Sequence, residues 1–148
     1  MRAPDIRLRP MPGRRVVATP AALDAVLSAG WPEAAVVVLR TAPDEAVGVG
    51  ARGPLDGLIA HDRHAIDVEE SALAGCWLTA AELGALVVPH LDWPLTAEAQ
   101  RPALEQGKVA GVPAKLWLAG AEDPRGAALL VVNRVYAAEI AERLGVAW

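Results

Sequence analysis

The stretch QGKVAGVPAKLWL, from Gln106 to Leu118, decides how the second half of this chain can fold. Successive side chains of a strand point to opposite faces of a sheet, and the apolar residues of this stretch alternate in that way. One face of such a strand carries Lys108, Ala110, Val112, Ala114, Leu116 and Leu118, and the other carries Val109, Gly111, Pro113, Lys115 and Trp117. The pattern predicts one long strand, in which Gly111 and Pro113 favour a bulge or an edge position.

A hairpin is predicted directly after this strand. Residues 119–126 read AGAEDPRG, a segment rich in turn-forming residues, and an apolar run follows over residues 127–132. Two apolar runs joined by a short turn-rich segment are typical of adjacent antiparallel strands. We therefore expect the long strand and the apolar run to pair with each other.

Most of the other predicted elements are strands as well. Apolar or alternating runs predict strands over residues 16–17, 34–39, 45–51, 64–70 and 72–78. Helices are predicted after Thr19-Pro20, after the capping-box pair Thr79 and Glu82, and from Val135 or Tyr136 to the stop at Gly145. Within residues 64–70, one face carries His64, Ile66 and Val68, and we expect that face to be the buried one.

This order of elements predicts an α+β fold. Strands dominate and are joined largely by hairpins, which favours a single domain with a mainly antiparallel sheet and about three helices packed on one face. We place this domain at residues 16–148. Residues 1–15 form a separate segment, called here the N-terminal arm.

The N-terminal arm is basic and rich in proline. It holds five of the 14 basic residues of the chain and one opposing acid, Asp5, whereas the chain as a whole has a net charge of -4. The basic residues of the arm are Arg2, Arg7, Arg9, Arg14 and Arg15. Such an arm either docks on an acidic partner or on phosphates, or it is a solvated terminal segment in which three prolines disfavour regular structure. Because the rest of the chain is acidic, nucleic-acid binding is not expected.

The cysteine count and the hydropathy indicate a soluble, cytoplasmic protein. The single cysteine, Cys76, cannot form an internal disulfide, and a reducing compartment is the default for such a chain. No apolar run approaches the roughly 20 residues of a membrane span, and no signal-peptide pattern is found at the start.

No set of residues in the sequence predicts a reaction. The segment from His61 to Glu70 contains two histidines and several carboxylates, but alternation along a strand would point them in different directions, so we expect no metal site. Cys76 lies in an apolar run, which is more typical of a buried thiol than of a nucleophile. Phosphate-binding, nucleotide-binding and zinc-binding motifs are also missing. We therefore expect no catalytic residues and no cofactor.

The five tryptophans are the best candidates for a binding function. Trp77 and Trp117 are predicted in the core or on a sheet face, whereas Trp93 and Trp148 are predicted to be exposed. Exposed tryptophans indicate a partner surface, a stacking site for a flat ligand, or a cap over the core of the chain itself. The candidate ligand- or partner-binding residues are Trp93, Trp117, His90, Trp148, Arg14 and Arg15.

Four segments resemble the succession of elements in the gamma subunit of heterotetrameric sarcosine oxidase. They read HAIDVEES, WLTAAELGALVVPHLDWPL, AGVPAKLWL and ALLVVNRVYAAEIAERL, and the matching residues are His64 to Asp67, Trp77 to Leu95, Val112 to Trp117 and Leu129 to Tyr136. Those subunits belong to the fold class of the folate-binding domain of the glycine-cleavage T-protein. The resemblance implies a small non-catalytic subunit that lies against a larger flavin- and folate-binding chain.

Three hypotheses about function follow. The first is a non-catalytic accessory or interaction subunit of a larger, multi-subunit enzyme. The second is a small-molecule binding domain that uses Trp93, Trp117 and His90 around a flat, folate-like ligand. The third is a stand-alone enzyme that uses Cys76 or His64, and we favour it least because no partner groups for either residue are evident.

Overall fold

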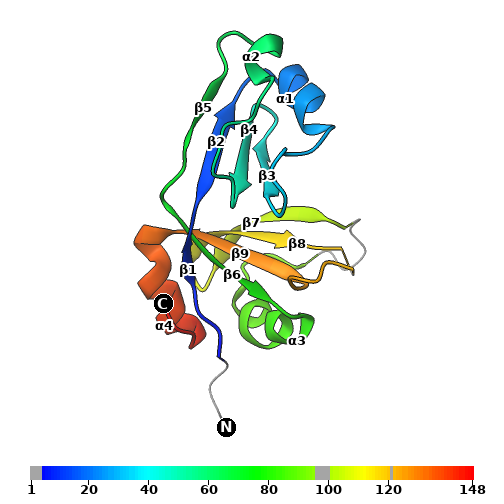
Figure 1. The fold of residues 1–148 in the computed structure, drawn as a ribbon. Helices are drawn as coiled ribbons and strands as arrows, with labels where there is room; N and C mark the ends of the chain where they lie inside the picture. Colours follow the sequence, from blue (N-terminus) through cyan, green and yellow to red (C-terminus); the bar gives the residue numbers. More distant parts are fainter. Residues whose placement is uncertain (1–4, 96–100, 121) are drawn as a thin grey trace. The chain divides into compact units, whose positions relative to one another are not determined.

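The computed structural model describes residues 5–95, 101–120 and 122–148, and it shows an α+β fold with two antiparallel sheets (Figure 1). The described strands form a five-stranded sheet in the order β1-β6-β9-β8-β7 and a four-stranded sheet in the order β3-β4-β2-β5. The chain divides into two compact units, Met1–Pro10 with Ala72–Trp148, and Met11–Ser71. We call them unit 1 and unit 2. The five-stranded sheet belongs to unit 1 and the four-stranded sheet to unit 2, with only Met11 of β1 crossing the division.

Unit 1 contains five strands and two α-helices among its described residues. The strands are β1 (Arg9–Met11), β6 (Leu73–Leu78), β7 (Ala103–Val109), β8 (Val112–Leu118) and β9 (Ala128–Asn133). Helix α3 (Ala80–Glu82) continues as a π-helix over Leu83–Val87 and a 3₁₀ turn over Val88–His90, and a second 3₁₀ turn (Arg134–Tyr136) precedes α4 (Ala137–Leu144). Unit 2 contains β2 (Gly13–Val17), α1 (Pro20–Leu27), β3 (Val37–Ala42), β4 (Glu45–Val49), α2 (Leu58–His61) and β5 (Ile66–Glu69).

The stretch from Gln106 to Leu118 forms a hairpin and not one long strand. β7 and β8 pair antiparallel in a register that places Val109 opposite Val112. The two residues between them have positive φ angles, 51° for Ala110 and 79° for Gly111, as the tightest hairpin turns require. The inward positions change from odd to even across the turn, since Val109 and Val112 are both buried in the same core. The sequence-based prediction was wrong because Ala110, an apolar residue in the turn, continues the apolar alternation of β8 in the sequence and hides this change. Gly111, read as an interruption of a ladder, is the residue that lets the chain reverse.

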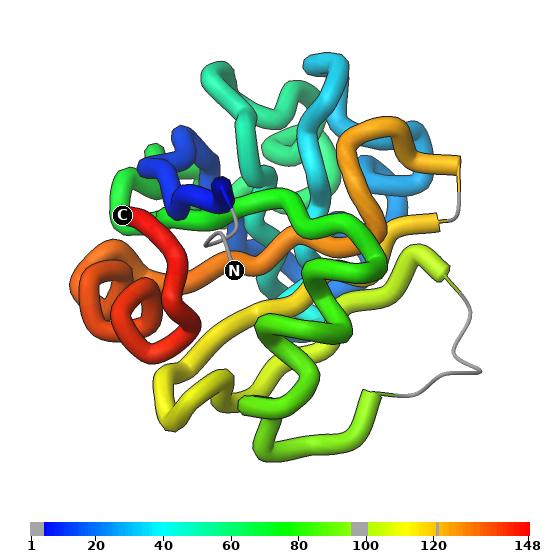
Figure 2. The backbone as a smooth tube through the Cα atoms, turned by 90° about the horizontal axis from the view of Figure 1, so that it is seen from below, coloured from blue at the N-terminus to red at the C-terminus, as the bar shows by residue number. Residues whose placement is uncertain are grey.

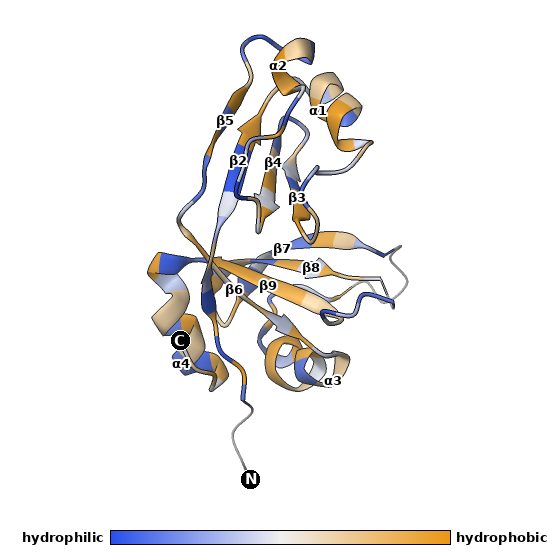
Figure 3. Cartoon of the chain, viewed as in Figure 1, coloured by the Kyte–Doolittle hydropathy of each residue, from blue (hydrophilic) through white to orange (hydrophobic). Residues whose placement is uncertain are grey.

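The second predicted hairpin, β8 with β9, is confirmed. The two strands pair antiparallel from Ala114 opposite Val132 to Leu118 opposite Ala128. β9 is apolar along nearly its whole length (Figure 3). Alternation along β8 turns Leu116 and Leu118 into the core of unit 1, and Trp117 therefore points to the other face of the sheet.

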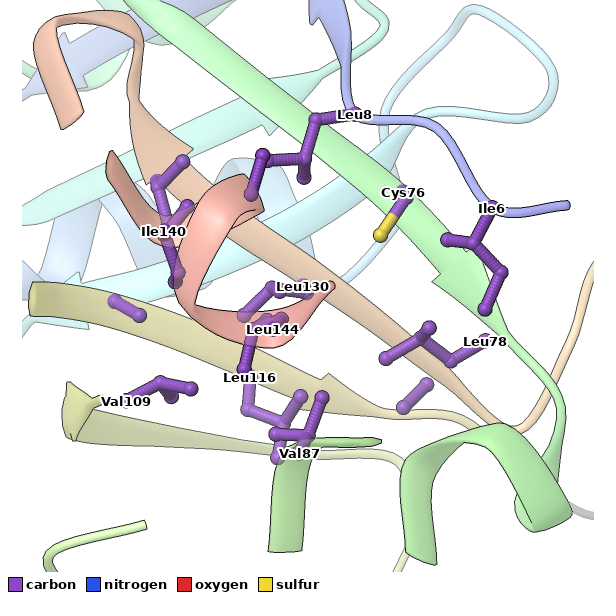
Figure 4. Close-up of a cluster of buried hydrophobic side chains, with 14 of the residues drawn as sticks. Ile6, Leu8, Cys76, Leu78, Val87, Val109, Leu116, Leu130, Ile140 and Leu144 are labelled. Carbon is purple, nitrogen blue, oxygen red and sulfur yellow. The ribbon is translucent and has the colours of Figure 1, made fainter. Parts of the chain in front are cut away.

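The core of unit 1 is aliphatic. Leu116 and Leu130 of the sheet, Ile140 and Leu144 of α4 and Val87 of the π-helix belong to one buried cluster (Figure 4). With no phenylalanine in the chain, leucine, valine and alanine supply most of this packing. Burying each large aliphatic side chain contributes about 1.5–3 kcal/mol relative to its exposed state.

The first described residues lie beside the C-terminal residues in unit 1 (Figure 2). The Leu8 N–H donates to the Ala147 carbonyl at 2.9 Å, and the Ala147 N–H donates to the Ile6 carbonyl at 2.9 Å. Ile6 and Leu8 are 6% and 1% exposed and belong to the core. From Ile6 onward the N-terminal arm thus differs from a solvated segment, because its apolar residues alternate with arginines in a strand-like pattern that the prolines had obscured. Its last residues, from Gly13, begin strand β2 of unit 2.

The helices do not lie together on one face of one sheet, so that part of the predicted fold is not confirmed. In unit 1, α4 and the π-helix pack on the five-stranded sheet. In unit 2, Leu23 of α1 and Leu58 of α2 join Val16 of β2 in a separate cluster. The predicted caps are confirmed: Thr19 accepts from an N–H in the first turn of α1, and Thr79 with Glu82 forms a capping box. No helix in the described part of the chain is long and apolar enough to cross a membrane.

Candidate interaction surface

Trp93 and Trp117 lie on opposite faces of the five-stranded sheet. Trp93 packs at the margin of the core of unit 1, over Gly107, where an added Cβ would lie 2.4 Å from a ring carbon of Trp93. Gly107 is paired with Ala114, whose side chain belongs to the core. Trp117 has the opposite parity on β8 and points away from that core. The structure therefore does not assemble the flat-ligand site predicted from these residues, and Trp93 is half-buried where exposure was predicted.

His90 contributes its backbone to the edge of β7. Its carbonyl accepts from the Ala110 N–H at 2.8 Å, and the Asp92 N–H donates to the Lys108 carbonyl at 3.1 Å. The Asp92 carboxylate in turn accepts from the Lys108 N–H at 2.9 Å. The segment from His90 to Asp92 thus pairs with the end of β7 nearest the hairpin turn. The His90 side chain is exposed.

Trp148 is exposed, as predicted, with 41% of its surface accessible. Its carbonyl accepts a hydrogen bond from the Arg7 guanidinium at 3.1 Å. The ring contact found for Trp117 among the described residues is with Trp77, which was not one of the candidate binding residues.

Arg14 and Arg15 are side chains of a sheet and not of a free arm. They are neighbours on β2 and therefore point to opposite faces. The Arg14 Nε donates to Asp67 at 2.9 Å, and the Arg15 Nε donates to Glu45 at 2.9 Å. Arg14 and Asp67 are the more enclosed pair, with side chains 13% and 17% exposed. Both guanidinium groups therefore have acidic partners within their own unit.

A compact aromatic cluster lies at the C-terminal ends of β6 and β8. The rings of Trp77 and Trp117 meet edge to face, with centroids 5.9 Å apart, and the Arg125 guanidinium lies 4.6 Å above the Trp77 ring. Asp123 accepts from Arg125 at 2.8 Å, and this side-chain bond, with a second from the Arg125 N–H, lowers the pKa of Asp123 to about 2. One ring face of Trp77 is thereby occupied by a residue of the same chain.

An open hollow of about 580 Å³ adjoins this cluster. Its lining includes Thr79, Leu83, Arg101, Gly120 and Asp123. The side chains of Thr79 and Asp123 already bond within the chain, to the start of α3 and to Arg125. None of the residues predicted for ligand binding lines this hollow.

Cys76 is buried in the core of unit 1, with 6% of its surface exposed. Burial raises the pKa of its thiol to about 12, and the negative charge of Glu82 adds to the effect. A thiol is a nucleophile only as the thiolate, so this environment opposes the hypothesis that Cys76 is catalytic.

The Asp62 carboxylate, near His64, accepts hydrogen bonds from backbone N–H groups. Asp62 accepts from the Thr19 N–H at 3.0 Å and from the His64 N–H at 2.9 Å, and these bonds lower the pKa of Asp62. The described part of the chain holds no group of three or more His, Cys, Asp or Glu side chains arranged to bind a metal ion. The His64 imidazole is exposed and accepts from the neighbouring Arg63 at 3.3 Å.

β5 presents the opposite face to solvent from the one predicted. Ile66 and Val68 were expected inside, but they are 51% and 46% exposed. Asp67 points inward, where its carboxylate accepts from Arg14 and, at 2.7 Å, from the Leu55 N–H. The predicted alternation of side chains along β5 is present, but alternation alone does not show which of the two faces is buried. Here Asp67 faces inward because its charge partner, Arg14, lies on β2.

The outer edge of β5 is unpaired among the described strands, since β5 stands last in its sheet, next to β2 (Figure 1). The Glu70 N–H donates inward, to the Gly13 carbonyl at 2.8 Å. Because inward and outward N–H groups alternate along an antiparallel strand, the N–H groups of Asp67 and Glu69 point away from β2. Among the described residues neither N–H group donates a backbone hydrogen bond, whereas the carbonyl of Asp67, on the same outward side, accepts from the Arg14 guanidinium at 3.3 Å.

A second hollow, of about 340 Å³, lies beside β5. Leu55, Leu58 and Ile59 line it together with Asp56, Ala65 and Asp67. Leu55 and Leu58 are buried, whereas Ile59 is 66% exposed. We use the name β5 surface for three features together: the unpaired edge, the exposed side chains of Ile66 and Val68, and this hollow.

Comparison of the chain with known protein families found no match, and comparison with curated proteins found none either.

Proposed function

We propose that this chain is a non-catalytic accessory subunit that binds a larger enzyme subunit through the β5 surface. The observation that carries the proposal is the unpaired edge of β5 with Ile66 and Val68 exposed beside it. Proteins normally protect such edges with charge, proline or a covering segment, because an open apolar edge pairs readily with another chain. Clustered exposed apolar side chains likewise mark partner surfaces.

The kind of partner is proposed from the sequence resemblance. The four segments that resemble the gamma subunit of sarcosine oxidase support a larger, flavin- and folate-binding subunit as the binding partner, with the chemistry on that subunit. The raised pKa of the Cys76 thiol fits a chain that carries no nucleophile there. The proposal includes a cytoplasmic location and no cofactor bound by the chain itself.

The test is native mass spectrometry of the chain purified from its own host. We expect a complex of fixed stoichiometry with a larger, flavin-containing subunit, and loss of that enzyme's activity when the chain is removed and its return when the chain is added back. The double variant Ile66→Lys with Val68→Lys should lose the complex. The matched control, Val88→Lys with Val135→Lys, alters two other exposed apolar residues and should keep it. A solitary monomer from the wild-type strain would contradict the proposal.

A small-molecule binding role is the second candidate, and the hollow of about 580 Å³ beside Asp123 and Arg101 favours it. The ligand would lie there and not between Trp93 and Trp117, which the sheet separates. Titration with 5-formyltetrahydrofolate should then quench the fluorescence of Trp77, which contacts Arg125, and Trp77→Phe should remove the change. If the ligand does not quench the fluorescence of the wild-type chain, the small-molecule role is wrong and only the accessory-subunit proposal remains.

A further inference from the structure

We infer that the partner binds the β5 surface as an added strand. The bound element is an extended segment, mostly apolar, with a lysine or arginine on the side that faces the hollow. This inference rests on the proposed function and specifies how the partner is recognised. Three independent features of unit 2 support it: the backbone of β5, the side chains on its two faces, and the local charge.

The backbone of β5 supplies the main recognition. The N–H groups of Asp67 and Glu69 point outward, as the bond from Glu70 to Gly13 fixes by alternation. A strand added at a sheet edge gains its affinity from such main-chain hydrogen bonds and its specificity from pockets for alternate side chains. β5 is four residues long, so the recognised segment is short.

The two faces of β5 offer different contacts to alternate side chains of an added strand. On one face, Ile66 and Val68 are half-exposed and would be covered by apolar side chains. On the other face, the hollow of about 340 Å³ has Leu55 and Leu58 in its wall and would take an apolar side chain. Apolar side chains of the added strand would therefore be removed from water at both faces, which favours binding.

The charge around the hollow indicates a basic residue in the partner. Asp56 lines the hollow, and Glu69 lies on the same face of β5 as Asp67. Arg14 of β2 is opposite Glu69, but its guanidinium is bonded to Asp67, which leaves this face with more acidic than basic groups. Both side chains belong to exposed residues, and no ion pair to either is found within the described part of the chain. A second copy of this chain would bring the same acids against each other, and like charges across paired strands are unfavourable. A different, basic segment is therefore the better occupant.

The direct probe is the end-blocked peptide KVVVKV, which has lysines and a valine on one face and valines on the other. Titration into the ¹⁵N-labelled chain should shift the amide signals of residues 65–70 at millimolar peptide or below. The peptide EVVVEV, with acids in place of the lysines, should bind at least tenfold more weakly. No shift with KVVVKV, or equal binding of the two peptides, would overturn the inference.

A pair of variants separates the backbone from the charge. Glu69→Pro removes both the outward N–H and the carboxylate, and proline is tolerated at a strand edge where the N–H faces outward. Glu69→Ala removes the carboxylate alone. We expect KVVVKV to bind at least tenfold more weakly to the proline variant than to the alanine variant, and equal binding would argue against strand addition. If Glu69→Pro does not fold, KVVVKV with N-methyl groups at alternate residues gives the same test on the wild type: one of the two methylation patterns should abolish binding.

The inference and the proposed function can fail separately. If the larger subunit is recovered and Glu69→Pro retains it as well as Glu69→Ala, the accessory role stands and strand addition at β5 is wrong. If no larger subunit is recovered, the proposed function is wrong. A dimer of the chain alone that Glu69→Pro dissociates would replace the basic partner by a second copy and would contradict the inference as stated.

Discussion

At the scale of single residues, Cys76 shows how environment overrides chemical type. Its thiol lies among apolar side chains and has a pKa of about 12, so at pH 8 only about one molecule in 10⁴ carries the thiolate. We predict that the native protein is not labelled by a thiol-specific disulfide reagent at pH 8 on the minute timescale. The same protein in denaturant should be labelled completely. Rapid labelling of the folded chain would show that Cys76 is accessible and ionised.

The lowered pKa of Asp123 leads us to expect that the stability of the folded chain changes with pH in the acidic range. Arg125 lowers the pKa of Asp123 from 3.8 to about 2 in the folded chain. A depressed pKa of this kind adds stability that is complete above the unfolded pKa and is lost as the pH falls through the folded value. The free energy of unfolding of Asp123→Asn should therefore lie below that of the wild type at pH 6.

The difference in unfolding free energy should shrink between about pH 4 and pH 2. Denaturant titrations at pH 6, 4, 3 and 2 provide the measurement. Glu122→Gln, next to Asp123 and exposed, is the matched control and should show no such convergence. A difference that stays constant down to pH 2 would show that the bond to Arg125 does not depress the pKa.

At the scale of the elements, the packing of the segment His90–Trp93 against β7 depends on a missing side chain. A Cβ at Gly107 would lie 2.4 Å from the ring of Trp93, far inside van der Waals contact. Gly107→Ala should therefore destabilise the chain by about 1–3 kcal/mol, the usual cost of overpacking. Gly120→Ala is the control, because its Cβ would meet no atom within 4 Å. Chemical denaturation of the two variants compares them, and equal stabilities would mean that Trp93 does not lie over Gly107.

The elements also show which parts of the fold the sequence can predict. Local signals were sufficient for the helix caps at Thr19 and Thr79 and for the hairpin of β8 with β9, because each depends on residues close in sequence. The turn at Ala110–Gly111 was missed because Ala110 is apolar and continues the alternation of β8 in the sequence, although the inward positions change from odd to even there. The inward face of β5 was also missed, since the ion pair between Arg14 and Asp67 joins residues far apart in the sequence.

At the scale of the whole chain, the candidate binding residues were chosen by type, and topology then dispersed them. Trp93 and Trp117 are separated by the parity of one strand, and Arg14 and Arg15 are used within their own sheet. The β5 surface, by contrast, is built from residues that looked like ordinary core positions. What identifies this surface is the exposure of Ile66 and Val68. That exposure depends on the fold and cannot be predicted from the sequence pattern.

The backbone hydrogen bonds between Ala147 and residues 6–8 give the last prediction. The Ala147 N–H donates to the Ile6 carbonyl, and Leu8 donates back to Ala147, so the first described residues complete the core of unit 1. Ala147→Pro removes the donor and leaves the Ile6 carbonyl without its partner, which should lower the unfolding free energy by about 1–3 kcal/mol. Trp148→Ala, which keeps the backbone bonds and alters an exposed ring, should change it by about 0.5 kcal/mol or less. Thermal or chemical denaturation compares the two variants. If residues 5–8 were a solvated arm, the two variants would be equally stable, because the backbone of Ala147 would make no hydrogen bonds to Ile6 and Leu8.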